Sequence, residues 1–142
     1  MGRIALSLSD FEGRWQIARV IEDAKSGGQG QFEGVAEFTP VAGGLRYEET
    51  GTLRLDGQPG FTANRVYHWQ SAGARIVVTF EDGRPFHDFD LADEAEARHW
   101  CDPDQYAVRY DFSDWPNWSA RWAVAGPRKD YVMTSHYLSA TA

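Results

Sequence analysis

The chain is poor in the features that mark several protein classes. A single cysteine, Cys101, excludes an internal disulfide and is typical of a reducing compartment. No apolar run approaches the roughly 18 residues of a membrane-spanning helix, and the N-terminus lacks the pattern of a secretory signal. Basic residues are also few, since 14 Lys and Arg face 21 Asp and Glu for a net charge of −7. We therefore expect a soluble, cytoplasmic protein without a membrane or nucleic acid as partner.

Long helical periodicity is missing as well, whereas aromatic residues are abundant. The 142 residues suit one domain, 1–142, with a substantial core. Six Trp, six Tyr and eight Phe are more than such a core requires. In an all-β protein the excess either lines a cavity or fills the interior of a barrel, and both alternatives stay open at this point.

Alternation of inward and outward residues runs through most of the chain. Gly13-Arg14-Trp15 opens the first alternating segment, which places Trp15, Ile17, Arg19 and Ile21 on one face. Further segments of this kind follow, with turn signals such as Asp56-Gly57 between them. The pattern predicts nine or ten strands joined by tight hairpins. We expect an antiparallel up-and-down β-barrel rather than a Greek-key sandwich.

Two segments depart from the alternation. Ser9 and Glu12 have the spacing of a capping box, which predicts a short N-terminal helical turn that plugs one end of the barrel with Leu8 or Phe11. The acidic segment 91–97 has no clear period, and we expect it to be a surface loop.

A short turn, then Gly13-x-Trp15, then a meander of strands and a late basic residue resembles the calycin superfamily of lipocalins and fatty-acid-binding proteins. This resemblance implies that Trp15 packs across the closed end of the barrel beneath Arg128 or Lys129. Gly13, Trp15, Arg128 and Lys129 would then be structural residues. Unlike lipocalins, the chain has no room for a helix after the barrel.

Three further motifs resemble the signature of an uncharacterised family of short calycin-like proteins, mostly bacterial. They are Gly83-Arg84-Pro85-Phe86-His87, Tyr110-Asp111-Phe112 with Trp115-Pro116-x-Trp118, and the segment 126–131 with the sequence GPRKDY. The resemblance covers nearly the whole chain. It implies no activity, so the functional hypothesis depends on the residues themselves.

Charged residues on inward faces are the main candidates for a site. Arg19 lies on a face with Trp15 and Ile17, Arg65 with Tyr67 and Trp69, and Glu49 with Tyr47. A buried guanidinium needs an anion, which is either a ligand carboxylate or phosphate or an internal glutamate. Together with interior aromatic and imidazole groups, the predicted ligand-binding residues are Arg19, Arg65, Tyr67, His87, His99, Tyr106, Tyr110 and Trp122.

The four histidines offer an alternative chemistry. Haem ligation through His87 or His99 is conceivable, and zinc is less so because His99 and Cys101 supply only two ligands. We expect no metal and no cofactor. An isomerase or hydrolase that uses an interior histidine with an arginine is a second alternative, although no phosphate loop or nucleophile elbow is present.

The sequence as a whole favours binding of a small, partly apolar, anionic ligand in the barrel interior, entered from the end opposite Trp15. A barrel enzyme and a filled barrel that acts as an interaction module are the alternatives. We expect a monomer or a homodimer. The identity of the ligand is not encoded in any motif.

Overall fold

The computed structural model describes residues 5–140, which form a single antiparallel sheet of ten strands and one 3-10 turn. The turn is η1 (Leu8–Phe11). The strands are β1 (Gly13–Asp23), β2 (Gln29–Val41), β3 (Gly44–Leu55), β4 (Phe61–Ala72), β5 (Arg75–Phe80), β6 (Pro85–Asp90), β7 (Glu94–Cys101), β8 (Asp104–Asp111), β9 (Trp118–Ala125) and β10 (Asp130–Ser139). No helix among the described residues is long and apolar enough to cross a membrane.

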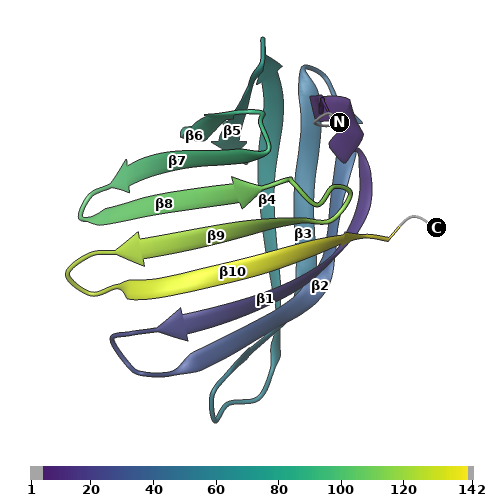
Figure 1. The fold of residues 1–142 in the computed structure, drawn as a ribbon. Coiled ribbons are helices and arrows are strands. Elements are labelled where there is room, and N and C mark those ends of the chain that lie inside the picture. The colour runs from purple at the N-terminus through teal and green to yellow at the C-terminus, as the bar shows by residue number, and fades with distance from the viewer. Residues whose placement is uncertain (1–4, 141–142) are drawn as a thin grey trace.

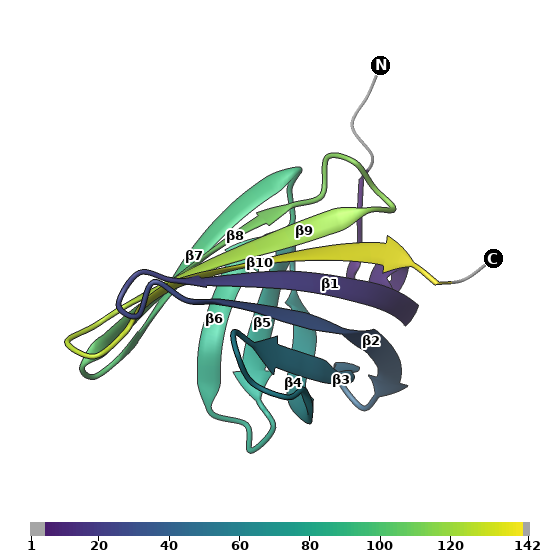
Figure 2. The ribbon, with the colours of Figure 1, turned by 90° about the horizontal axis from the view of Figure 1, so that it is seen from below.

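The strands follow the order β6-β5-β4-β3-β2-β1-β10-β9-β8-β7, so each hairpin partner is also a neighbour in the sheet. The last strand returns to the first, with Trp15 opposite Ser139. The sheet curls so that β3 to β6 lie across from β8 to β10 (Figures 1 and 2). Its two end strands, β6 and β7, lie beside each other and leave the barrel nearly closed. The predicted fold class is confirmed.

One end of the barrel is plugged by Phe11 at the end of η1. Its side chain has no exposed surface, and its ring lies 4.9 Å from that of Trp115 and 5.3 Å from that of Trp69. The indole of Trp15 donates a hydrogen bond of 2.9 Å to the Phe11 carbonyl oxygen. Ser7 and Asp10 form the capping box, two residues before the predicted pair of Ser9 and Glu12. We refer to this end as the closed end.

The closed end does not use the late basic residues. Antiparallel pairing puts Trp15 beside Ser139, at one end of β10, whereas Arg128 and Lys129 precede the other end of that strand. The Lys129 ammonium lies instead 5.8 Å from the centre of the Tyr106 ring. The expected contact of Trp15 with Arg128 or Lys129 is therefore wrong, because the length of β10 separates them.

A pair of facing glycines shapes the middle of the sheet. Gly34 on β2 is the direct partner of Gly51 on β3. A Cβ atom added to either one would lie 2.2 Å from a backbone oxygen of the neighbouring strand. Glycine inside a strand marks close backbone approach, typically where a barrel turns a corner. Both positions thus require glycine.

The acidic segment is mostly strand rather than loop. β7 begins at Glu94 and alternates, with Ala95 buried and Glu94 and Glu96 exposed. Its inward residues are small alanines, so the alternation of hydrophobicity is weak. This is why the sequence missed the first half of the strand. The turn before it, 91–93, connects the two end strands of the sheet.

Candidate functional site

Between the closed end and the opposite hairpins lies an internal cavity of about 280 Å³. The barrel is therefore not filled by its aromatic residues. Polar side chains line the cavity together with apolar ones: Arg19, Tyr47, Glu49, Arg65, Tyr67, Trp69, Val78, Phe86, His87, Tyr106, Tyr110, Trp118, Ala120, Trp122, Lys129, Tyr131, Met133 and Tyr137. We call the end of the cavity near Arg65 and Lys129 the mouth and the end near Trp118 the deep end.

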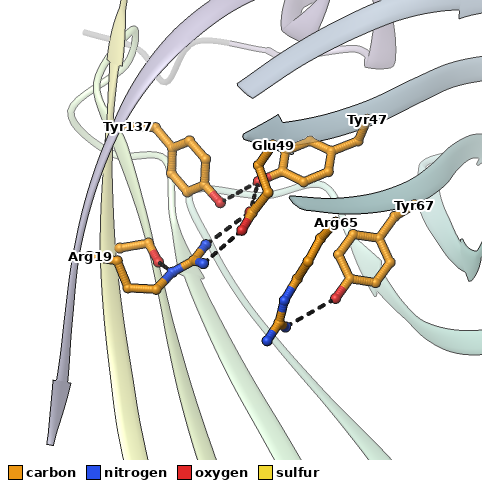
Figure 3. A network of polar contacts seen from close by, with 7 residues as sticks. Arg19, Tyr47, Glu49, Arg65, Tyr67 and Tyr137 are labelled. Carbon is orange, nitrogen blue, oxygen red and sulfur yellow. Dashed lines mark hydrogen bonds and ion pairs between the residues drawn. The ribbon is translucent and has the colours of Figure 1, made fainter. Parts of the chain in front are cut away.

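The most buried charge on this wall is an ion pair between β1 and β3. The two terminal nitrogens of Arg19 donate to the two carboxylate oxygens of Glu49 at 2.7 and 3.0 Å (Figure 3). The Nε of Arg19 donates to the Ser135 hydroxyl on β10 at 2.6 Å. This geometry is bidentate, the arrangement in which a guanidinium binds a carboxylate most strongly. Of the two alternatives for Arg19, the internal glutamate is the one that the structure shows.

Two tyrosines complete this network. The Tyr47 hydroxyl donates to the Glu49 carboxylate and accepts from the Tyr137 hydroxyl at 2.9 Å (Figure 3). Burial alone would raise the pKa of Glu49, but the hydrogen bonds and charge of Arg19 hold it below its usual value. Burial raises the pKa of Tyr137 to about 12. The carboxylate is therefore ionised and the phenols are protonated at neutral pH, which makes the network a neutral unit.

Arg65 differs from Arg19 in having no such partner. It extends from β4 beside the network, and its Nη1 lies 3.4 Å from the Tyr67 hydroxyl, a long hydrogen bond (Figure 3). Arg65 forms no ion pair with any residue that the structure describes. Its side chain is solvent-exposed at the mouth and also lines the cavity. No carboxylate of the described residues thus contacts Arg65, although its cross-strand partner Glu49 acts on it from a greater distance.

Lys129 is the third cation of the lining and does have a partner. Its ammonium lies 3.1 Å from a carboxylate oxygen of Asp104 and donates to the Tyr106 hydroxyl at 3.3 Å. These contacts raise the pKa of Lys129. Glu49 is the only carboxylate among the lining residues described, and it already serves Arg19. With Lys129 paired to Asp104 and Arg19 to Glu49, Arg65 is the cation of the described lining that no carboxylate contacts.

His87 lies further inside, on β6. Its Nε2 is 2.9 Å from the Tyr110 hydroxyl, and its side chain is buried. Burial lowers the pKa of His87 to about 3, so the imidazole is neutral at physiological pH. His99 lies outside the cavity lining, half-buried against the Phe86 ring at 5.2 Å.

The apolar wall is built around Phe86. Its ring is parallel to that of Trp122, with centroids 5.1 Å apart and an interplanar angle of 6°. It also stacks on Phe80 at 4.5 Å and on Tyr67 at 5.4 Å. The Phe86–Trp122 contact joins β6 to β9 across the seam where β6 and β7 share no backbone pairing in the described sheet. Met133 lies opposite Trp122 on this wall, and Trp69 and Val78 extend the apolar surface toward the deep end.

The structure brings together all but one of the predicted ligand-binding residues. Arg19, Arg65, Tyr67, His87, Tyr106, Tyr110 and Trp122 line one cavity, and His99 does not. Whether they bind a ligand stays a prediction. The sequence did not single out Tyr131, Met133 and Tyr137, although alternation in the last strand places them on one face with Ser135.

Metal ligands do not gather in the part of the chain that the structure describes. No group of three or more His, Cys, Asp or Glu side chains is placed to hold an ion. Cys101 is exposed near the end of β7, away from the cavity lining.

Comparison with known proteins gives the chain a family. Residues 11–139 match the model of a family of unknown function, DUF6314. The chain belongs to this family. Among solved structures, an S-type phycobiliprotein lyase, CPES from Guillardia theta, has a TM-score of 0.66 over 95% of this chain and 91% of its own. Only 9% of the aligned residues are identical, so the likeness shows the fold alone. No curated protein matches the sequence.

The family match agrees with the motif-based expectation of a short family without a known activity, and a nearly closed ten-stranded barrel fits a calycin-like fold. Neither result names a ligand for this member of DUF6314. The functional conclusion therefore depends on the cavity and its charges.

Proposed function

We propose that this protein binds a small, partly apolar carboxylate inside its barrel, with the carboxylate at Arg65. The single observation that carries this proposal is the contrast between the two interior arginines. Arg19 is neutralised by Glu49 through two hydrogen bonds, whereas Arg65 lines the same cavity without an ion pair among the described residues. A guanidinium fork is well suited to a carboxylate.

Neighbouring groups at the mouth support an anion. The Tyr67 hydroxyl lies beside the Arg65 guanidinium, and the Lys129 ammonium, which is paired with Asp104, also lines the cavity. Glu49 is the cross-strand partner of Arg65, but its carboxylate is bound by Arg19 and Tyr47 and makes no ion pair with Arg65. Hydrogen bonds to charged groups contribute about 1.5–3 kcal/mol each. We therefore expect the mouth to hold a carboxylate through charged hydrogen bonds of this usual strength.

The rest of the cavity favours an apolar body. Aromatic faces of Phe86 and Trp122 form one wall with Met133 beside them, and Trp69 and Val78 lie further in. A ligand with a carboxylate at one end and a ring or short chain behind it would cover both parts. This combination is typical of ligand pockets, which are mostly apolar with a few polar groups that fix orientation.

The size of the cavity limits the ligand. The cavity measures about 280 Å³. An engineered cavity of about 150 Å³ accommodates benzene, so this one is close to twice that size. A ligand of about 10–15 non-hydrogen atoms fits this space on that scale. The fold shared with a phycobiliprotein lyase makes a bilin-like pigment a class worth testing. A bilin or a haem would have to extend out of the mouth, so we favour a smaller molecule.

Catalysis is the weaker candidate. His87 would have to act as the base, and its pKa of about 3 makes it a poor one at neutral pH. Its neighbour Asp88 is exposed on the opposite face of β6 and cannot orient the ring. A purely structural interaction module is also disfavoured, because such a module needs no cavity.

The test compares a carboxylate with its neutral amide. We expect phenylbutyrate to bind the wild-type protein at least about tenfold more tightly than phenylbutyramide, because one charged hydrogen bond contributes at least about 1.5 kcal/mol. The Arg65→Gln variant should lose this preference. Isothermal titration calorimetry gives both affinities, and quenching of the tryptophans that line the cavity provides a second readout.

Arg84→Gln is the matched control. Arg84 follows the β5–β6 turn at the same end of the barrel, is paired with Asp82 and does not line the cavity. Its replacement removes the same charge and should leave the preference for the acid unchanged. Equal binding of acid and amide by the wild-type protein, or equal losses in both variants, would refute a specific carboxylate site at Arg65.

A further inference from the structure

Two buried polar atoms beside the cavity have no hydrogen-bond partner among the described residues. They are Nδ1 of His87 and Nε1 of Trp118. The two residues are 7% and 3% exposed, and both line the cavity. A buried donor or acceptor without a partner is unfavourable, and native proteins seldom leave one so. Two on the wall of one cavity therefore call for an explanation.

Comparable groups nearby are satisfied by the protein itself. The indole of Trp15, also buried, donates to the carbonyl oxygen of Phe11. The hydroxyls of Tyr47 and Tyr137 bond to each other, and that of Tyr110 bonds to His87. The fold can thus pair polar aromatic side chains at this depth. The two exceptions both border the space that we assign to a ligand.

The chemistry of the two atoms defines what would satisfy them. Trp118 Nε1 carries a hydrogen and can only donate. His87 is neutral, and its Nε2 faces a tyrosine hydroxyl that can either donate or accept. His87 Nδ1 is consequently free to act as a donor or as an acceptor. A neutral oxygen, as in a hydroxyl or a carbonyl group, fits this pair, whereas a second carboxylate would be buried there beside no cation that contacts it among the described residues.

We propose that the deep end of the cavity is a second, neutral polar subsite, formed by His87 and Trp118, and that the ligand is a carboxylate with a hydroxyl or carbonyl oxygen at its far end. This inference rests on the proposed function, since the mouth sets the orientation of the ligand. The deep subsite concerns the end of the ligand remote from the carboxylate. It favours carboxylic acids with an oxygen at that end over acids with a purely hydrocarbon body.

The experiment compares phenylbutyrate with its para-hydroxy derivative by isothermal titration calorimetry. The two probes share the carboxylate and the ring and differ in one hydroxyl at the end remote from the carboxylate. We expect the hydroxylated probe to bind the wild-type protein about fivefold or more tightly. Homologues with one methylene fewer or more allow for the distance between the two subsites, and the preference should be largest at one chain length.

Two variants of His87 distinguish the roles of its two ring nitrogens, because each keeps a polar group near only one of them. His87→Asn keeps an amide group near the position of Nδ1 and loses the contact with Tyr110. His87→Gln keeps a group near the position of Nε2 and leaves the position of Nδ1 empty. We expect the preference for the hydroxylated probe to persist in His87→Asn and to disappear in His87→Gln. A merely structural role of His87 would affect both probes alike in both variants.

His99→Gln is the matched control, because His99 is half-buried near Phe86 but does not line the cavity. It should keep the wild-type preference. Circular dichroism establishes that each variant is folded before binding is measured. If the wild-type protein binds both probes equally at every chain length through Arg65, the deep subsite is refuted and the proposed function stands. If it binds neither the acids nor the amide, both proposals fail.

Discussion

Replacement of Glu49 by glutamine should destabilise the fold substantially, because it leaves the Arg19 guanidinium buried without a counter-charge. The side chains of Arg19 and Glu49 are 11% and 4% exposed, and they share two hydrogen bonds. Glutamine can accept only one of these bonds and carries no charge. The Arg19 guanidinium cannot lose its proton, so it stays charged and its buried charge is left without a counter-charge.

The expected magnitude follows from the burial of the pair. Two unit charges about 4 Å apart attract each other by about 4 kcal/mol at an effective dielectric constant of about 20. Removal of one partner from a buried ion pair typically costs about 3–5 kcal/mol. Because glutamine retains one acceptor and Ser135 still contacts Arg19, we expect a loss of about 3 kcal/mol in the free energy of unfolding. For a chain of this size the Tm should fall by roughly 6–12 °C.

Urea unfolding followed by tryptophan fluorescence measures this loss, with the double variant Arg19→Met/Glu49→Leu as the control. Replacing both members of a buried ion pair by apolar residues is often nearly neutral. We therefore expect the double variant to lie within about 1 kcal/mol of the wild-type protein, more stable than either single variant.

A loss below about 0.5 kcal/mol in Glu49→Gln would contradict the reasoning, since only a solvated surface pair contributes so little. The reasoning would also be refuted if the double variant were as unstable as the sum of the single ones, because the two residues would then not be coupled.

Two further predictions concern stability. The pKa of His87 falls from 6.5 in a free imidazole to about 3 in the fold, so the unfolded chain binds the extra proton first and stability should decline as the pH falls from about 6.5 toward 3. The part of this decline that His87 causes, up to about 1.4 kcal/mol per pH unit, should be absent from His87→Phe in urea unfolding between about pH 6.5 and 5, above the range in which Glu49 and the other carboxylates with lowered pKa add their own loss. At the closed end, Phe11→Ala should cost about 3–5 kcal/mol because a fully buried ring is lost from the aromatic cluster. Glu12→Ala, an exposed change beside the same turn, should cost less than about 0.5 kcal/mol in the same assay.

Much of the fold could be predicted from local patterns. Alternation identifies a strand whenever one face is large and apolar, as in the segment from Trp15 to Ile21, and Gly and Asp turns separate the strands. It failed at the start of β7, where the inward residues are alanines and the outward ones are acidic. A strand is therefore recognised from alternation only where its inward residues are clearly more hydrophobic than its outward ones, whatever its strand propensity.

Alternation also predicted part of the site, namely which charged side chains face the interior. Alternation assigns side chains to a face, and it correctly put Arg19, Arg65 and Glu49 inside. It does not tell which of two inward arginines meets the inward glutamate. Register alone would favour Arg65, which is the direct cross-strand partner of Glu49 on β4. The direction and reach of the side chains inside the barrel decide instead that Glu49 bonds to Arg19 on β1, which leaves Arg65 at the mouth.

Gly13-Arg14-Trp15 illustrates the division between sequence and structure. By itself the sequence determined that a strand begins there, that the chain is an all-β meander and that its charged residues include some that face inward, because these properties follow from local periodicity. The tertiary structure alone decided that Lys129 lies at the mouth rather than over Trp15. It alone also decided that the aromatic residues surround a cavity instead of filling it, because strand register and the packing of side chains from distant strands are set only when the barrel closes.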